Sequence, residues 1–217
     1  MLDLLIDNQA VLIEGVLTTL GVSFLAIALG APLGLILATA SRQNNGLVRR
    51  STRVYVSFWR GTPILVQLLL IFYLLPAIGI NLPPTLAAVV ALACNTAAFQ
   101  SEIYRAGLAA VPEGEVEAAQ MLALSRRQIL AKIEAPQAIR IMLPALVGET
   151  LALVRNSSLI SVIAVTDLTR RAQQIASSTF QPLDSYMIAL ILYVAIALVL
   201  SAIGMLLERR LKQQEAH

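Results

Sequence analysis

The sequence predicts an all-α, polytopic membrane protein with five transmembrane helices. Of the 217 residues, 58% are hydrophobic and 13% are charged, whereas about a quarter of the residues in an average soluble domain are charged. The hydrophobic residues also gather in long runs, and a helix needs roughly 20 mainly apolar residues to cross a bilayer. No low-complexity linker interrupts the chain. Residues 1–217 are therefore expected to form a single transmembrane domain.

Five hydrophobic runs are expected to form the membrane spans. In chain order, they cover about residues 11–40, 63–80, 83–107, 139–154 and 186–207. The first run contains the four glycines Gly15, Gly21, Gly30 and Gly34. Such small residues let helices approach one another closely in lipid. Between the fourth and fifth runs, Thr166 is expected to cap a short helix that has Asp167 in its first turn.

The basic residues predict the orientation of the chain. Thirteen of the sixteen Lys and Arg residues lie between the first and second runs, between the third and fourth runs or at the adjoining ends of those two, or after the fifth run. The positive-inside rule places such segments in the cytoplasm. The N-terminus is then outside and the C-terminus cytoplasmic, as an odd number of spans requires. Because orientation explains the net charge of +3, no nucleic acid partner is expected.

Residues 111–136, VPEGEVEAAQMLALSRRQILAKIEAP, carry seven charged side chains between two hydrophobic blocks. A turn at Pro112 precedes three glutamates in the first turn of a predicted helix, where acids complement the helix dipole. Ser125 and Gln128 fit a capping box that begins a second short helix, and Pro136 is expected to end or kink that helix. From the residues alone, the loop is either an amphipathic hairpin resting on the membrane or a docking element for a soluble subunit.

A motif within this loop favours docking. EAA at 117–119, followed by Ile133 and Pro136, resembles the EAA motif of binding-protein-dependent ABC importer permeases. The pattern of that family is E-A-A, three residues, Gly, nine residues and I-x-L-P. Two positions depart from it, because Ala123 replaces the usual Gly and Ala135 replaces the usual Leu. A small residue is tolerated at the first of these positions unless a positive φ is required there.

Longer segments resemble the polar amino-acid subfamily of these permeases: FWRGTPILVQLLL at 58–70, AAFQSEIYRAGLAAVPEGEVEAA at 97–119 and LVRNSSLISVIAVTDLTRRA at 153–172. The resemblance implies that two identical or related permeases pair around a central pathway. It also implies that each permease docks a coupling loop, about residues 111–140, into an ATP-hydrolysing subunit, and that an extracytoplasmic solute-binding protein delivers the amino acid. The residues expected to couple the loop to ATP hydrolysis are Glu113, Glu117, Ala118, Ala119, Ala123, Arg126, Ile133 and Pro136.

The chain itself lacks a motif for binding ATP. A P-loop requires G-x-x-x-x-G-K-[ST], but the two lysines, Lys132 and Lys212, follow Ala131 and Leu211. ATP and magnesium are therefore expected on a partner ATPase. The chain is expected to be a transporter subunit with no cofactor and no catalytic residues. One Cys and one His give no basis for a metal site.

Polar residues in the fourth run are the candidates for contact with substrate. Glu149 lies nine residues past the last arginine before this span, or about 13 Å into the bilayer at 1.5 Å per residue. It is expected either to line the pathway or to form a structural hydrogen bond. Asn156, Ser157 and Ser158 follow where the span is expected to break, and unwound backbone there would either bind an amino acid or simply cap the helix. Asp167 would either bind a cationic side chain or stabilise a helix start.

These features together predict the permease subunit of an ABC importer that carries polar amino acids across the bacterial cytoplasmic membrane. A basic amino acid is compatible with Glu149 and Asp167. The alternative is an ion-coupled secondary amino-acid transporter, which would keep an acid such as Glu149 but would need no docking loop. A structural membrane scaffold is a third possibility. The expected partners are ATPase subunits, a second permease subunit, a solute-binding protein, the amino acid and membrane lipid.

Overall fold

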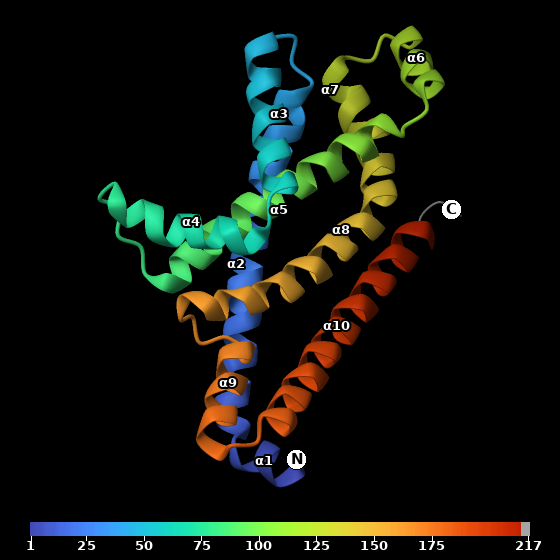
Figure 1. Ribbon diagram of the computed structural model, residues 1–217. Coiled ribbons are helices and arrows are strands. Elements are labelled where there is room, and N and C mark those ends of the chain that lie inside the picture. The colour runs from blue at the N-terminus through green and yellow to red at the C-terminus, as the bar shows by residue number, and fades with distance from the viewer. Residues whose placement is uncertain (214–217) are drawn as a thin grey trace.

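The computed structural model describes residues 1–213, and this part of the chain is helical with short connections (Figure 1). In chain order the elements are α1 (Leu2–Asp7), α2 (Gln9–Ser41), α3 (Gly46–Gly61), α4 (Ile64–Ala77), α5 (Pro84–Ala109), α6 (Glu113–Met121), α7 (Arg126–Ile129), the π-helical turn η1 (Leu130–Glu134), α8 (Ala135–Ser157), the 3₁₀-helix η2 (Ser158–Ile163), α9 (Leu168–Thr179) and α10 (Pro182–Gln213).

Four stretches within residues 1–213 are long and apolar enough to cross a membrane. They are α2, α5, the continuous stretch Arg126–Ile163 and Pro182–Leu211 of α10. The pair α3–α4, which is bent by 110°, provides a fifth span when it is counted as one unit. The predicted all-α membrane fold is thus confirmed. A straight second span over residues 63–80 is not found, because α4 has only 14 residues and the amphipathic helix α3 precedes it at an angle.

Buried amide side chains hold the corner between α3 and α4. Gln67 is 1% exposed, and its Nε2 donates to the carbonyl oxygens of Trp59 and Thr62 at 2.9 and 3.0 Å. Asn95 on α5 donates to Gln67 Oε1 at 2.8 Å and to the Trp59 carbonyl at 3.1 Å. α3 ends here because Pro63 disfavours the helical conformation for the residue before it, Thr62. The amides therefore satisfy carbonyls at a broken helix end and tie the corner to α5.

α5 lies at the centre of the molecule and is the most buried of the four long spans. Gly30 on α2 packs directly against it. A Cβ added at Gly30 would lie 2.2 Å from Thr96 Cγ2 and 2.9 Å from the Ala93 carbonyl oxygen. Gly34 is similarly close to α5, whereas a Cβ at Gly21 would meet nothing within 4 Å. The close approach predicted from the glycines is therefore confirmed at Gly30 and Gly34, and also at Gly15, where an added Cβ would lie 2.9 Å from Leu168 Cα.

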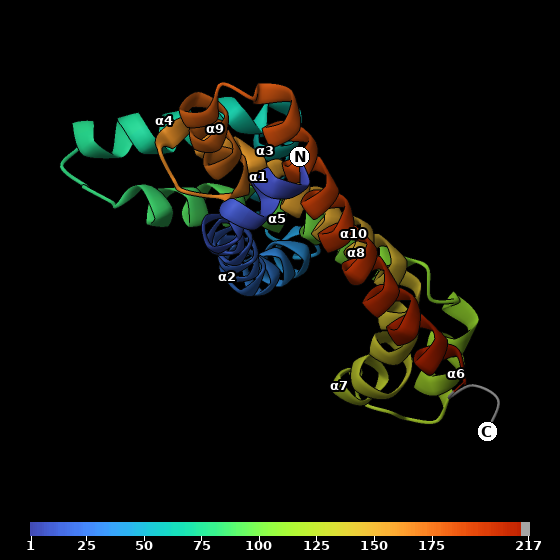
Figure 2. The same cartoon turned by 90° about the horizontal axis from the view of Figure 1, so that it is seen from below.

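The two ends of the molecule contain different segments. α6, α7 and the connection between α2 and α3 lie at one end, and α1, α9 and the N-terminus lie at the other (Figure 1). Seen from below, α6 and α7 project from one side and α4 from the other (Figure 2). At the N-terminal end, the Met1 amino group pairs with Asp184 at 3.1 Å and Glu14 pairs with Arg171 at 2.6 Å. Two of the three segments expected in the cytoplasm are thus grouped at one end (Figure 1).

The structure decides two predicted helix boundaries. Asp167, rather than Thr166, caps α9, because its carboxylate accepts from the backbone N–H groups of Thr169 and Arg170 at 3.2 and 3.0 Å. Of the two alternatives at Pro136, an end of the helix is not found, because the helix continues from α7 through η1 into α8, but its direction changes between α7 and α8 (Figure 1). The π-helical turn immediately before this proline explains why the helix continues. Its wider repeat avoids the clash between a proline ring and the carbonyl four residues earlier.

Candidate functional site

The charged loop, residues 111–140, folds as two short helices that enclose a groove. α6 starts after Pro112 with Glu113 and Glu115 in its first turn. The Gln137 side chain donates to Glu115 and so joins the start of α8 to α6. A groove of about 420 Å³ lies between these elements. The loop is therefore a folded unit with its own internal contacts.

α6 ends in a Schellman motif built on an alanine. The Leu124 N–H donates to the Ala119 carbonyl at 3.2 Å, and the Ala123 N–H donates to the Gln120 carbonyl at 2.9 Å. These two bonds define the motif. Ala123 has a φ of +56°, in the left-handed region where the Cβ of any residue other than glycine is crowded. Ala123 therefore adopts the backbone conformation that glycine adopts most easily.

The predicted capping box begins α7. The Ser125 N–H donates to Gln128 Oε1 at 2.9 Å, and the Gln128 N–H donates to Ser125 Oγ at 3.4 Å. One turn later Ile129 is 2% exposed. These bonds confirm the predicted capping box, which depends only on neighbouring residues. The buried isoleucine then anchors this short helix.

A buried acid, Glu134, is not one of the functional residues that the sequence predicts. It is 4% exposed, and its Oε1 accepts from Arg126 Nη1 at 3.1 Å. Its Oε2 has no hydrogen-bond partner in the part of the chain that the structure describes. The two residues are eight positions apart, and the wide turn η1 brings them closer to one helix face than an α-helix would. A search at α-helical spacing would not pair them.

The residues expected to couple the loop to a partner fall into two groups. The exposed group comprises Glu113, Glu117, Ala118, Ala123, Arg126 and Pro136. Ala119 is 3% exposed, and Ile133 is partly buried. Ala118 is exposed and Ala119 is buried, and both line the groove. An exposed and a buried position of the motif are therefore adjacent in the chain.

Glu149 lies where α8 packs on α5. Thr96 Oγ1 donates to Glu149 Oε1 at 3.0 Å. Thr96 is fully buried, whereas Glu149 is only partly buried. The carboxylate therefore has one fixed partner within the span and still reaches the surface of this chain. Both alternatives considered for Glu149, the structural hydrogen bond and the pathway, are compatible with this position.

The residues after Glu149 lie in a tightened helix rather than in unwound backbone. α8 passes into the 3₁₀-helix η2 at Ser158. Ser157 is fully buried and donates to the Val154 carbonyl at 2.7 Å, and Ser158 donates to the Arg155 carbonyl at 2.8 Å. The expected break is therefore a change of helix type. Both hydroxyl protons are used by the backbone, which leaves Asn156, partly buried, as the available polar side chain here.

Asp167 is fully buried at the start of α9. Besides capping the helix, its Oδ2 accepts from the Tyr193 hydroxyl at 3.3 Å. Burial raises the pKa of the Asp167 carboxyl, and hydrogen bonds from the backbone amides oppose that rise. Asp167 and Glu149 share no hydrogen-bond partner within residues 1–213. The same region contains no group of three or more His, Cys, Asp or Glu side chains that could hold a metal ion.

Comparison with known proteins identifies the family. The family model described as "Binding-protein-dependent transport system inner membrane component" matches residues 30–213. The chain belongs to this family. It is 36% identical over 201 residues to a putative glutamine transport system permease protein of Rickettsia typhi, covering 92% of each chain. It is 37% identical to the L-cystine transport system permease protein of Bacillus subtilis, covering 95% of this chain and 88% of that protein.

A further family member and a solved structure extend the comparison. The arginine transport system permease protein of Bacillus subtilis is 34% identical, with 94% of each chain covered. The structure "Crystal structure of an amino acid ABC transporter with histidines" matches with a TM-score of 0.90 and 37% identity, covering 95% of this chain and 96% of that one. These comparisons support an ABC transport-system permease and not the ion-coupled secondary transporter.

Proposed function

We propose that the chain is the membrane-spanning permease subunit of an ABC importer for polar amino acids in the bacterial cytoplasmic membrane. The observation that carries the proposal is the match over nearly the whole chain to an amino acid ABC transporter of known structure. The relatives are named for the transport of glutamine, L-cystine and arginine. The proposed substrate class is therefore polar amino acids rather than one of these three. The N-terminus is outside, and the charged loop is cytoplasmic.

Two such permeases, identical or related, form the pathway in this proposal, and a solute-binding protein delivers the amino acid from outside. ATP and magnesium are bound by separate ATPase subunits. The charged loop docks on these subunits through its exposed residues, among them Glu117, Ala118 and Arg126. The Schellman motif and the capping box support this role because they fix the two short helices relative to each other. Movement of the ATPase subunits then passes through α7 and η1 into α8.

Glu149 is the proposed contact with the substrate ammonium. Support comes from its position within the span, from its partial exposure and from the single hydrogen bond that holds it. A carboxylate inside a membrane span is costly unless it serves a cavity or a partner. Thr96 donates to one carboxylate oxygen, so the proposed contact with the ammonium is through the other oxygen.

Uptake into proteoliposomes tests the importer. The permease, its co-expressed ATPase and its binding protein should import a labelled amino acid only with ATP inside, and vanadate should stop the import. Uptake that follows a proton gradient without ATP would overturn the proposal.

The substrate contact is tested separately. Glu149→Gln keeps the acceptor for Thr96 but removes the charge, so uptake should fall about tenfold or more if one charge-assisted contact of about 1.5–3 kcal/mol is lost. Thr96→Val removes the hydroxyl that donates to Glu149, and its matched control is Thr18→Val, because the Thr18 hydroxyl donates to the Glu14 carbonyl in its own helix. Normal uptake by Glu149→Gln would assign the carboxylate to structure.

A further inference from the structure

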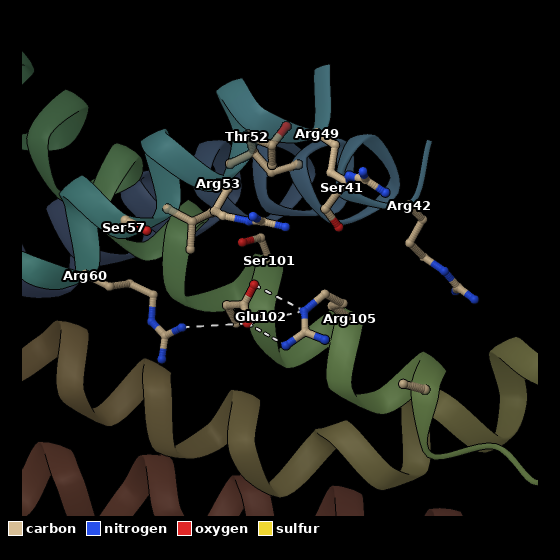
Figure 3. A pocket seen from close by; sticks show the side chains of 13 residues that line it. Ser41, Arg42, Arg49, Thr52, Arg53, Ser57, Arg60, Ser101, Glu102 and Arg105 are labelled. Carbon is tan, nitrogen blue, oxygen red and sulfur yellow. Dashed lines mark hydrogen bonds and ion pairs between the residues drawn. The ribbon is translucent and has the colours of Figure 1, made fainter. Parts of the chain in front are cut away.

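A strongly basic cavity lies between α2, α3 and α5. Its volume is about 530 Å³, and it is close to the connection between α2 and α3. Five arginines and one glutamate line it, namely Arg42, Arg49, Arg53, Arg60, Arg105 and Glu102. In Figure 3, Arg49 and Arg53 extend from α3 toward Ser41 and Ser101, above the pair formed by Glu102 and Arg105. None of the roles proposed above uses this cavity.

The charges around the cavity do not balance. Glu102 pairs with Arg105 at 2.7 Å and with Arg60 at 3.7 Å, and it is therefore already shared between two guanidinium groups. No ion pair joins Arg42, Arg49 or Arg53 to any side chain in the described part of the chain. Like charges around one space repel each other. An anion in the cavity would remove that repulsion.

The two faces of α3 place this cavity at the membrane surface. Positions 49, 52, 53, 56 and 60 line the cavity at helical spacing. Other positions carry the large exposed apolar side chains Leu47, Val54 and Phe58, and Trp59 and Tyr55 lie beside them. Amphipathic helices with aromatic residues and arginines lie in the interface between lipid headgroups and acyl chains. The cavity is then at the depth of the phosphate groups.

We propose that this cavity binds a phosphate group, supplied by an anionic phospholipid of the cytoplasmic leaflet. Arg49 and Arg53 are the donors, because the guanidinium fork fits two phosphate oxygens at once. Basic pockets between membrane helices on the cytoplasmic side bind anionic headgroups in this way. The choice of leaflet rests on the proposed orientation, but the phosphate site itself does not.

An amino acid in transit fits this cavity less well. Its carboxylate would meet the arginines, but its ammonium group would need an acid. Glu102 is the one acidic side chain in the lining, and two arginines already hold it. A phosphate group carries negative charge and has no attached ammonium group that would need an acid in the lining. The charge composition therefore favours a phosphate.

The assembled transporter with its ATPase subunits provides the test. Native mass spectrometry with added phosphatidylglycerol measures the dissociation constant of the retained lipid. Arg49→Gln/Arg53→Gln should weaken binding about 100-fold or more, since each position loses a charge-assisted hydrogen bond to the phosphate that is worth at least about tenfold. Arg50→Gln is the matched control, because Arg50 is on the same helix and lines a different pocket. Its dissociation constant should rise by about fivefold at most, the general effect of one basic residue near a membrane surface.

Two further measurements keep the outcome clear. Arg49→Lys/Arg53→Lys keeps the charge but loses the planar fork, so it should bind with intermediate strength even if the Gln variant fails to fold. Titration with inorganic phosphate shows the source of the group: displacement of the lipid at millimolar phosphate would support the same site with a soluble ligand. Equal lipid binding by the wild type and the double Gln variant would overturn the proposal, as would an equal loss in Arg50→Gln. Displacement of the lipid by the transported amino acid would assign the cavity to the pathway and also overturn it.

Discussion

Ala123→Gly should stabilise the bend of the charged loop. A left-handed conformation costs a residue with a Cβ roughly 1–2 kcal/mol, and Ala123 adopts it with a φ of +56°. Glycine removes this cost but loses about 0.5–1 kcal/mol more conformational entropy on folding. The net gain is therefore expected to be about 0.5–1 kcal/mol, or up to about a fivefold change in the local opening equilibrium.

Amide hydrogen exchange on a peptide that contains residues 119–125 measures this opening, because the two Schellman bonds protect amides within it. Exchange should slow by up to about fivefold in the variant. Ala118→Gly is the matched control, since the same substitution in the exposed, regular part of α6 should speed exchange by about the same factor. If both variants speed exchange equally, the left-handed alanine carries no cost and the reasoning fails. A stabilised bend with unaltered ATPase coupling would show that coupling tolerates either residue.

Three further substitutions probe packing and capping. Gly30→Ala should lower the melting temperature of the transporter, because the added Cβ would overlap Thr96 at a cost of about 1–3 kcal/mol. Gly21→Ala is the control and should leave the melting temperature unchanged. Equal effects of the two variants would contradict the close contact. Asp167→Asn should keep both stability and transport, since Asn caps a helix about as well as Asp, while Asp167→Ala should lose about 1 kcal/mol of stability; selective loss of cationic substrates in the Asn variant would instead indicate a substrate contact. Gln67→Met should destabilise the fold by about 1–3 kcal/mol for each buried group left unpaired, seen as a lower midpoint in thermal denaturation; an unchanged midpoint would mean that the amides do not hold the corner.

The features that the sequence predicted depend on composition or on neighbouring residues. The spans follow from the length of the hydrophobic runs, and the capping box of Ser125 and Gln128 follows from a spacing of three. The EAA pattern is equally local, which is why the sequence alone predicts the two short helices and their bend.

The features that it did not predict depend on contacts between distant segments. The α3–α4 corner requires Gln67 to meet Asn95, 28 positions later, and no pattern within either segment indicates this contact. The burial of Glu134 and its pairing with Arg126 depend on a π-helical turn, which shifts the faces on which side chains lie. The basic cavity appears only when arginines from α2, α3 and α5 are brought together in space. The separate segments look like ordinary cytoplasmic charge.

The unbroken helix from Arg126 to Ile163 also has a mechanical consequence. Along this helix, Arg126 and Glu149 are about 35 Å apart at a rise of 1.5 Å per residue. Figure 1 shows that α7 and α8 run in different directions, so only α8 is a straight α-helix, and a movement delivered at its start reaches Glu149 along a stiff axis. Rotation is different, since η1 holds one residue more per turn than its neighbours. If that extra residue were expelled, α8 would turn by about 100° against α7, and Glu149 would swing away from Thr96.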